Sequence, residues 1–222
     1  MNIPKIYINP GHSDRDPGAV GYETERKLNV AVSQYMNEYL LANYRCETLV
    51  GSDDNLLVVC QEANNLGANL FVSPHFNAGK GDGYEGYVYN KNRVPLGEIF
   101  AKYIAEAGQN LRESDIAPGV KIQPGYIVLK HTNMPAIITE SAFVDNLKDV
   151  QDWDEEHELA LLGIAHAKAA AEFLNLEKKN QPVYSVSFRG KVGPFTDKKT
   201  AEDLLAALKD AGYDVEIVES VV

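Results

Sequence analysis

Short apolar runs alternate with longer amphipathic runs along most of the chain, from residue 5 to residue 174. The short runs are rich in β-branched and aromatic residues and are bounded by Gly, Pro, Asn or Asp, which is typical of strands. We therefore predict strands at residues 5–9, 46–50, 70–73, 84–89, 126–129 and 136–139.

The longer runs place apolar side chains three or four positions apart, which is the spacing of one helix face. Strands that alternate with such helices predict an α/β domain, in which a mostly parallel, twisted sheet is flanked by helices. We expect this domain to occupy residues 1–174. Its helices are predicted at residues 26–41, 55–66, 96–111 and 156–174.

The apolar period stops at residues 175–182, a polar stretch closed by Pro182 that we predict to be a linker. Residues 183–222 are expected to form a small β-α-β unit. One such unit is short for an independent fold, so a second copy from another chain is expected to complete it, which predicts a homodimer. Its predicted parts are a strand at 184–189, a loop at 190–197, a helix at 199–211 ended by Gly212, and a strand at 213–219.

Charge and composition narrow the classes of function. The chain has 21 basic and 32 acidic side chains and a formal net charge of −11, which argues against nucleic acid as a partner because phosphate binding needs clustered Lys and Arg. No run approaches the roughly 20 apolar residues of a membrane span, and the start of the chain lacks a secretory-signal pattern. Cys46 and Cys60 are expected to be unpaired buried thiols, so we expect folding in a reducing compartment.

Two of the five histidines follow directly after predicted strands. His12 lies in a loop rich in Gly, Pro and Asp after the strand at 5–9, and His75 follows the strand at 70–73. Ligands of an open α/β sheet collect beyond the carboxyl ends of the strands, so these side chains are expected to face one another there. Imidazole is a common zinc ligand, which makes a metal site one interpretation of this pair.

A catalytic zinc site holds three protein ligands and leaves a fourth position open, and two histidines with one glutamate is a recurring set. Glu23 and Glu25 both precede the helix predicted from residue 26, and both can reach back over the loop that carries His12. The alternative is an ordinary role, because the macrodipole favours acidic residues in the first turn of any helix. These considerations do not choose between the two glutamates.

Glu140 directly follows the apolar strand at 136–139, at the edge of the same crevice. Burial raises the pKa of a carboxyl group, which suits a general base that takes a proton from water and gives it to a leaving amine. The alternative is an acid bound to backbone at a strand end. Of the remaining histidines, His131 is expected to border the cleft as a substrate contact, His157 to lie in solvent and His166 to lie in or beside the core.

Four motifs, in this order, resemble the zinc-dependent type-3 family of N-acetylmuramoyl-L-alanine amidases, which are peptidoglycan hydrolases of phage endolysins and bacterial autolysins. The resemblance extends over residues 5–174. The motifs are Pro10-Gly-His-Ser-Asp-Arg-Asp-Pro-Gly-Ala-Val-Gly21, Glu25-Arg-Lys-Leu-Asn-Val30, Val72-Ser-Pro-His-Phe-Asn-Ala78 and Val128-Leu-Lys-His-Thr-Asn-Met-Pro-Ala-Ile-Ile-Thr-Glu140.

The resemblance implies Zn²⁺ as the cofactor, with His12, Glu25 and His75 as its ligands and Glu140 as the catalytic carboxylate. Its pattern, in which the glutamate precedes Leu-Asn by three positions, favours Glu25 as the third ligand. Two positions depart from the family, and both are expected to shape the loop or support the ligands. Asn9 stands where the family commonly has Asp, and Ser13 stands where it commonly has a second Gly.

The C-terminal unit is similar to half of a SPOR-type peptidoglycan-binding domain, which implies that it holds the enzyme on glycan strands. The similarity rests on its strand, loop and helix: Tyr184-Ser-Val-Ser-Phe188, Val192-Gly-Pro-Phe195, Ala201-Glu-Asp-Leu-Leu-Ala-Ala-Leu208 and Ala211-Gly-Tyr213.

The function that these resemblances imply is hydrolysis of the amide between N-acetylmuramic acid and L-alanine in peptidoglycan. One alternative is a zinc peptidase acting on the stem peptide, although no motif marks the arginine that would bind a substrate carboxylate. Another is a catalytically inactive cell-wall-binding protein, against which the presence of all four chemical residues argues. As an endolysin or autolysin, the protein is expected to stay in the cytoplasm until lysis or a holin releases it onto the cell wall.

Overall fold

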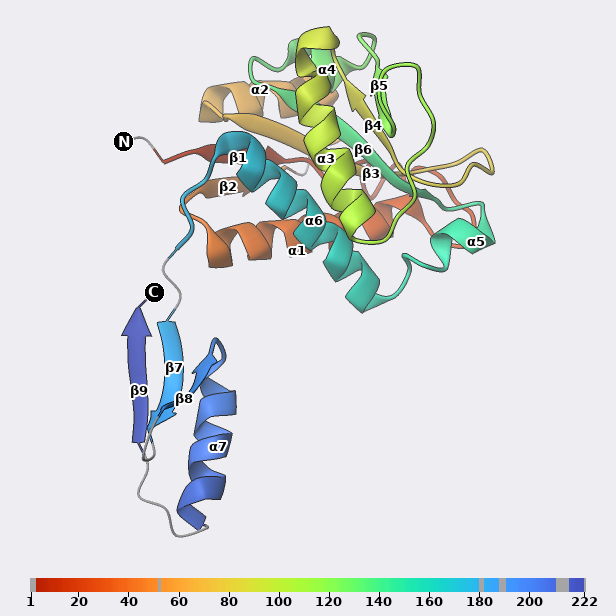
Figure 1. Cartoon of the computed structure of the whole chain (residues 1–222). Coiled ribbons are helices and arrows are strands. Elements are labelled where there is room, and N and C mark those ends of the chain that lie inside the picture. The colour runs from red at the N-terminus through yellow and green to blue at the C-terminus, as the bar shows by residue number, and fades with distance from the viewer. Residues whose placement is uncertain (1–2, 52, 180–181, 188–190, 211–215, 222) are drawn as a thin grey trace. The chain divides into compact units, whose positions relative to one another are not determined.

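The computed structural model describes residues 3–51, 53–179, 182–187, 191–210 and 216–221. The chain forms two compact units, Met1–Glu177 and Lys178–Val222 (Figure 1). Each unit has its own sheet and its own cluster of buried apolar side chains. Within the described ranges, no helix has the length and apolar character that crossing a bilayer requires.

The first unit is built on a six-stranded sheet of order β2-β1-β3-β6-β4-β5. The strands β2, β1, β3 and β6 run parallel, β4 runs antiparallel to β6, and β5 runs parallel to β4. The predicted α/β fold with a mostly parallel sheet is therefore confirmed. The strands are β1 (Lys5–Ile8), β2 (Glu47–Val50), β3 (Leu70–Asn77), β4 (Glu85–Val88), β5 (Val120–Ile122) and β6 (Ala136–Phe143).

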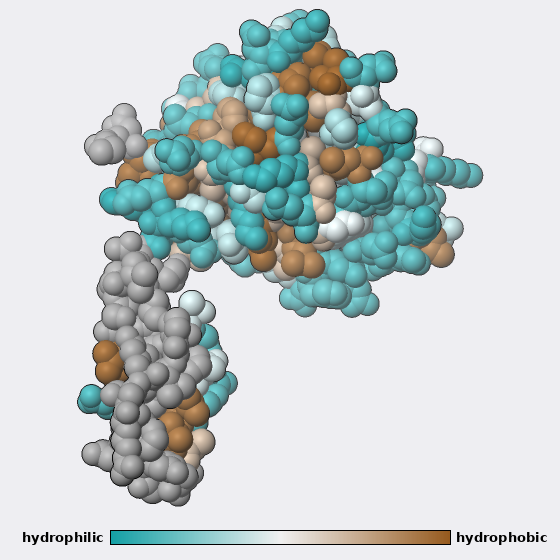
Figure 2. All heavy atoms as spheres, viewed as in Figure 1, coloured by the Kyte–Doolittle hydropathy of each residue, from teal (hydrophilic) through white to brown (hydrophobic). Residues whose placement is uncertain are grey.

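Helices flank both faces of this sheet. In Figure 1, α1, α3 and α6 lie over one face, whereas α2 and α4 contact each other on the opposite face. The outer surface of α1, α3 and α6 is mostly hydrophilic (Figure 2), as their solvent-facing position requires. The helices are α1 (Glu25–Asn43), α2 (Leu56–Leu66), α3 (Val94–Glu106), α4 (Ile127–His131), α5 (Leu147–Val150) and α6 (Glu156–Leu174), with a short 3-10 turn at Lys91–Arg93.

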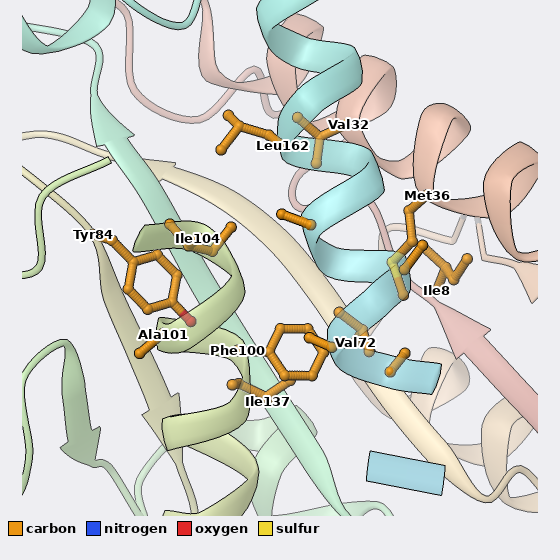
Figure 3. Packing of buried hydrophobic residues seen from close by; sticks show 14 of the residues in the cluster. Ile8, Val32, Met36, Val72, Tyr84, Phe100, Ala101, Ile104, Ile137 and Leu162 are labelled. Carbon is orange, nitrogen blue, oxygen red and sulfur yellow. The ribbon is translucent and has the colours of Figure 1, made fainter. Parts of the chain in front are cut away.

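Alternate residues of β1 enter different cores, because successive side chains of a strand point to opposite faces of its sheet. Ile6 and Ile8 are buried in the larger core with α1, α3 and α6, whereas Tyr7 is buried in the smaller core with α2 and α4. Figure 3 shows the larger core, where side chains of the three helices cover those of the sheet. Gly163 allows α6 to approach α1, since a Cβ there would overlap Tyr35.

Residues 126–129, predicted as a strand, lead into and form most of helix α4, so that prediction is wrong. A run of a few apolar residues does not distinguish a strand from a buried helix, and neighbouring segments decide between them. Here α4 packs on α2, and the Cys60 thiol donates a hydrogen bond to the carbonyl of Ile127 at 3.9 Å. A strand that was not predicted, β5, precedes this segment, and its three residues are too few to show the alternation of apolar and polar positions that marks a strand.

The predicted helix at 96–111 runs from Val94 to Glu106. Gly108 adopts a φ of 112°, a conformation that ends a helix and that glycine tolerates best. Leu111 therefore lies beyond the helix, in a loop that pairs with Tyr84 at the start of the β4 segment. At the end of the first unit, Leu176 packs on the core and the backbone N–H of Arg45 donates to the carbonyl of Glu177 at 2.8 Å.

The second unit contains a three-stranded antiparallel sheet of order β8-β7-β9. Strand β8 occupies part of the predicted loop at 190–197, so the unit is β-β-α-β rather than β-α-β. The Gly-Pro pair within β8 resembles a turn, but proline is tolerated in an edge strand. Gly212, Arg189 and residues 213–215 lie outside the described residues. The elements are β7 (Pro182–Ser187), β8 (Lys191–Phe195), α7 (Lys198–Asp210) and β9 (Glu216–Val221).

Helix α7 lies along this small sheet (Figure 1). Its Ala201 is buried, and the apolar side chains Leu204, Leu205, Leu208 and Ile217 pack against it. The predicted apolar face of the helix is therefore the one that contacts the sheet.

Candidate metal and catalytic site

A cavity of about 490 Å³ opens at the carboxyl ends of β1, β3 and β6. The residues that line it come from segments far apart in the sequence, as expected where strands of an open sheet end. They include all four residues singled out by the sequence, together with polar and apolar side chains of the surrounding loops. The lining residues are Asn9, His12, Ser13, Arg15, Asp16, Glu25, Asp53, Asp54, Leu56, Ser73, His75, Phe76, Asn77, Ala78, Tyr126, Ile127, Val128, Ile138 and Glu140.

His12, Glu25 and His75 converge at one end of this cavity. Nε2 of His12 lies 3.0 Å from Oε2 of Glu25, and Nδ1 of His75 lies 2.8 Å from Oε1 of the same carboxylate. The two imidazole rings meet edge to face with their centroids 5.1 Å apart. One ligand atom from each residue lies within 4.8 Å of the others, so the three side chains form a possible metal-binding triad.

The backbone around the triad holds these side chains in place. His12 adopts a left-handed φ of 63°, which turns the loop after β1 back over the sheet. Gly18, with a φ of 72°, fits closely between the triad residues, because a Cβ there would overlap both Glu25 and the His12 ring. Asn29, one helical turn after Glu25, donates a hydrogen bond to the carbonyl of Gly11 at 3.0 Å and so ties α1 to this loop.

Glu25 is buried, and donors surround its carboxylate. The backbone N–H of Ala19 donates to Oε2 at 2.9 Å, and the backbone N–H of Phe76 donates to Oε1 at 3.3 Å. Burial acts to raise its pKa, but the hydrogen bonds from His12 and His75 outweigh burial and hold the pKa of Glu25 well below its usual range. The hydrogen bond to Glu25 in turn raises the pKa of His12 to about 9, against the effect of burial.

This donor set fits zinc. Two neutral imidazoles and one carboxylate provide the nitrogen and oxygen ligands that zinc binds, and three protein ligands leave a position open for water or substrate. Asp16 accepts at 3.1 Å from Nδ1 of His12, which leaves Nε2 of that ring for the triad. Such an outer hydrogen bond fixes the tautomer of a ligating histidine.

Glu140 lies beside the triad within β6, which extends beyond the predicted strand at 136–139 to Phe143. In the sheet register, His75 of β3 pairs with Glu140, and Glu140 pairs with Glu85 of β4, so the three residues form one row across neighbouring strands. Oε2 of Glu140 is buried and has no hydrogen-bond partner among the described residues. Burial raises the pKa of Glu140 to about 7.

The structure separates the remaining candidates from the triad. Glu23 forms an ion pair with Lys27 at 2.8 Å on the surface of α1, so it is Glu25 that joins the histidines. His131 is exposed and does not line the cavity. His157 is exposed beside Glu158, as predicted.

His166 is fully buried, as predicted. It lies 2.8 Å from the hydroxyl of Thr139 and 2.7 Å from the carbonyl of Leu162. Burial lowers its pKa to about 4, so the ring is neutral in the folded protein at neutral pH. Its position on the far side of β6 makes it part of the core rather than part of the cavity.

The two positions that depart from the family pattern have structural partners. Asn9 donates from its amide to the hydroxyl of Ser73 at 3.2 Å, which links β1 to β3. The hydroxyl of Ser13 accepts from the backbone N–H groups of Arg15 and Asp16, both at 3.2 Å, and so shapes the loop that carries His12.

The sequence did not single out the charged cluster that adjoins Glu140. Buried Glu85 is contacted by Arg112 and Lys121, which lie on segments well after it in the chain. No spacing between the three residues marks them as a group, because only the pairing of β4 with β5 and the loop before β5 brings them together. A lone acid in the otherwise apolar run at 84–89 is the one signal that the sequence offers.

The fold is that of the catalytic domain of an amidase. The family model described as N-acetylmuramoyl-L-alanine amidase (Amidase_3) matches residues 6–172, and the chain belongs to this family. Its peptidoglycan hydrolase function, expected from the sequence, is thereby confirmed.

Individual relatives agree with this assignment. The chain is 30% identical over 220 residues to the sporulation-specific N-acetylmuramoyl-L-alanine amidase of Bacillus subtilis (strain 168), covering 95% of this chain and 82% of that protein. It is 28% identical over 190 residues to the endolysin of Bacillus phage SPP1, covering 79% of this chain and 68% of that protein. The catalytic domain of CwlV, an amidase from Bacillus (Paenibacillus) polymyxa var. colistinus, superposes with a TM-score of 0.71 at 27% identity, covering 79% of this chain and 100% of that domain.

Proposed function

We propose that the amidase activity of this chain depends on one Zn²⁺ ion held by His12, Glu25 and His75, with Glu140 as the general base. The observation behind this proposal is that one cavity holds both a possible metal-binding triad and, beside it, the buried carboxylate of Glu140. The triad offers nitrogen and oxygen ligands that lie close together. Glu140 pairs with His75 on the neighbouring strand, and one of its carboxylate oxygens lacks a hydrogen-bond partner among the described residues.

When bound, Zn²⁺ supplies Lewis-acid chemistry, which lowers the pKa of a water from about 16 towards about 7 and polarises the scissile carbonyl. His12 would hold the ion through Nε2, His75 through Nδ1 and Glu25 through its carboxylate. The hydrogen bond from His12 Nδ1 to Asp16 and the backbone donors to Glu25 keep these groups in position.

Glu140 moves the protons of the reaction. It takes a proton from the attacking water and gives it to the nitrogen of L-alanine as the amide bond breaks. A carboxyl group whose pKa is near 7 can accept a proton and release it again at neutral pH, and burial raises the pKa of Glu140 to this value. The apolar side chains of Ile138 and Val128 line the same cavity.

The second unit, in this proposal, holds the enzyme on glycan strands and thereby raises its local concentration at the substrate. The alignment with the sporulation-specific amidase supports a shared role, because it spans 95% of this chain and so reaches into this unit. We also propose that two chains pair through this unit. Sedimentation of the full chain tests the pairing, and a monomer at micromolar concentration would exclude it.

The cellular role proposed for the chain is that of a lytic enzyme, a phage endolysin or an autolysin. It would be retained in the cytoplasm until lysis or a holin gives it access to the wall. The relatives named as an endolysin and as a sporulation-specific amidase support this pair of alternatives. The timing of release in the producing cell, followed with an antibody to the chain, distinguishes them.

The decisive experiment is digestion of purified peptidoglycan with zinc-loaded and with chelator-stripped protein, followed by mass spectrometry of the new chemical ends. We expect stem peptides with a free L-alanine amine, released only by the zinc-loaded protein. Trimmed stem peptides that stay attached to sugar would instead identify a peptidase. Unchanged glycopeptides in both samples would identify an inactive binding protein.

A further inference from the structure

Beside Glu140, two cations share one buried carboxylate. The guanidinium Nε of Arg112 and the ammonium of Lys121 both donate to Oε1 of Glu85, the latter at 2.5 Å. The other oxygen, Oε2, accepts from the hydroxyl of Tyr87 at 2.6 Å and from the amide of Asn77 at 3.3 Å. The cluster therefore carries one positive charge in excess, although the chain as a whole carries −11.

The two cations of this cluster are accessible, whereas the carboxylate is not. The side chains of Arg112 and Lys121 are 35% and 37% exposed, and that of Glu85 is 4% exposed. Arg112 is also held over the ring of Phe143, with 4.9 Å between the guanidinium carbon and the ring centroid. These cations are fixed at a defined place with part of their surface open to solvent.

The register of the sheet places the cluster on the same face as the catalytic row. Glu85 pairs with Glu140, and Lys121 of β5 pairs with Tyr87, two residues after Glu85 on β4. Paired residues of neighbouring strands, and residues two apart on one strand, point to the same face. His75, Glu140, Glu85 and Lys121 therefore follow one another across β3, β6, β4 and β5 on a single face.

The distance between the strands determines how long a substrate segment must be to reach from Glu140 to the two cations. Neighbouring strands lie about 4.8 Å apart, so β5 lies about 10 Å from β6. An extended chain advances about 3.5 Å per residue. A peptide whose first amide is cleaved beside Glu140 thus brings the side chain or carboxyl group of its second residue to Arg112 and Lys121.

The approach from the other side is unfavourable to an anion. There, Lys121 borders a separate hollow that is also lined by the acidic residues Glu113 and Asp115. Towards Glu140, the neighbours are Asn77, which lines the catalytic cavity, and Tyr126, whose ring contacts that of Tyr87 at 5.4 Å between centroids. Asn77 and Tyr126 therefore connect the catalytic cavity, which the two cations do not themselves line, with the charged cluster.

We propose that Arg112 and Lys121 form a subsite for a carboxylate on the second residue of the peptide that the enzyme releases. This subsite rests on the proposed function, since it assumes that the amide is cleaved next to Glu140. Charge-assisted hydrogen bonds from a guanidinium and an ammonium recognise such a group. The subsite makes the enzyme selective for acidic stem peptides over peptides in which this carboxylate is a neutral carboxamide.

The alternative role of the two cations is to neutralise Glu85. A single cation balances the charge of one carboxylate, and Tyr87 and Asn77 already provide neutral donors to it. The two roles predict different results: loss of a substrate subsite acts on carboxylate substrates alone, whereas loss of a structural partner acts on folding and on every substrate.

Binding to the full, zinc-loaded chain with the Glu140→Gln change, which blocks turnover, measures the subsite apart from catalysis. The two ligands are N-acetylmuramoyl-L-alanyl-D-glutamate and its diamide, compared by isothermal titration calorimetry. We expect the carboxylate ligand to bind about tenfold more tightly, which corresponds to about 1.4 kcal/mol. Equal affinities for the two ligands would overturn the proposal.

Variants in the same background assign the preference to residues. We expect Arg112→Gln and Lys121→Gln each to remove most of the preference while the affinity for the diamide changes less than about twofold. The matched control Lys102→Gln, which alters an exposed lysine paired with Glu172 on the opposite face, should keep the preference. If both ligands lose affinity equally in the first two variants, the cations serve Glu85 and the subsite does not exist.

Two further measurements keep the test decisive. If the glutamine variants do not fold, Lys121→Arg and 0.5 M salt replace them: the conservative change should keep the preference and salt should reduce it, because the contact is ionic. A preference that salt leaves unchanged would refute the subsite. Cleavage of the same two ligands by the unaltered enzyme tests the proposed function separately, since binding selectivity does not require turnover.

Discussion

Two glutamates line the same cavity, and their surroundings differ. Glu25 accepts hydrogen bonds from His12, His75 and the backbone of Ala19, whereas Oε2 of Glu140 has no partner among the described residues. Burial acts to raise the pKa of both, yet the donors hold that of Glu25 well below its usual range while that of Glu140 rises to about 7. The donors around a buried carboxylate, more than its depth, therefore decide whether it stays charged or exchanges a proton.

The largest effect is expected from removing the proton-accepting carboxylate. Glu140→Gln should lower the rate of amide cleavage by about 10³-fold or more, because general base catalysis contributes about 10²–10⁴-fold and the other carboxylate of its row, Glu85, is already paired with Arg112 and Lys121. Zinc content and melting temperature should stay unchanged. Release of L-alanine amines from peptidoglycan measures the rate, and Glu98→Gln on the exposed face of α3 is the matched control. Full activity of the Glu140→Gln protein would remove Glu140 from the mechanism.

Removing the charge of Glu25 is expected to weaken metal binding. Glu25→Gln removes the anionic ligand and is expected to weaken zinc binding by more than about 100-fold, since changes at mere outer partners already cost about 10–100-fold. Zinc retained after dialysis, measured by mass spectrometry, checks this. Glu23→Gln is a close control, because Glu23 lies two positions away and pairs with Lys27 instead. Equal zinc content in both variants would contradict the proposed ligand set.

His166 is a buried base, and burial shifts its pKa in the direction opposite to that of a buried carboxyl group. Burial lowers its pKa from 6.5 to about 4, so between these values the unfolded chain binds the proton and the folded protein does not. The contribution of His166 to stability is complete above about pH 6.5 and falls by about 3 kcal/mol as the pH drops to 4. Urea unfolding of the wild type and of His166→Gln from pH 7 to pH 4 checks this. The wild type should show the steeper loss, and equal slopes would be the contrary result.

The smallest effect is expected from the outer hydrogen bond of the triad. Asp16→Asn weakens the hold on Nδ1 of His12, and zinc affinity should fall about tenfold, because Asp16 is largely exposed and water can replace part of its role. A competition titration with a chromogenic chelator measures the change. Asp14→Asn, at an even more exposed neighbouring position, should have no effect. A similar loss in both variants would mean that loop charge, and not this hydrogen bond, sets the affinity.

Much of the site could be predicted because three of its residues lie near the carboxyl ends of strands. His12, His75 and Glu140 each come at or near the carboxyl end of a predicted strand, and parallel strands bring such ends to one edge. Glu25 could not be separated from Glu23 by this argument, since two residues at the start of one helix satisfy it equally. Only the family pattern favoured Glu25, and the structure places it between the histidines while Glu23 pairs with Lys27.

The fold was harder to predict where segments are short. Residues 126–129 were expected to be a strand and lead into helix α4, because their contact with α2 is absent from any local pattern. Strand β5 has three residues and β8 contains a Gly-Pro pair, so neither carries a periodic signal. The long runs that formed α1, α2 and α6 were predicted well, since many residues repeat the same spacing.

Local patterns in the sequence were enough to predict the α/β alternation and three of the four residues that converge on the cavity, His12, His75 and Glu140, because periodic burial and position near a strand end are local properties. The tertiary structure alone decided the strand order, the reversal of β4 and β5, and the union of Glu85 with Arg112 and Lys121. These features depend on pairing between segments far apart in the chain, for which no local period exists. A buried charge and its partners are therefore visible only once the sheet has assembled.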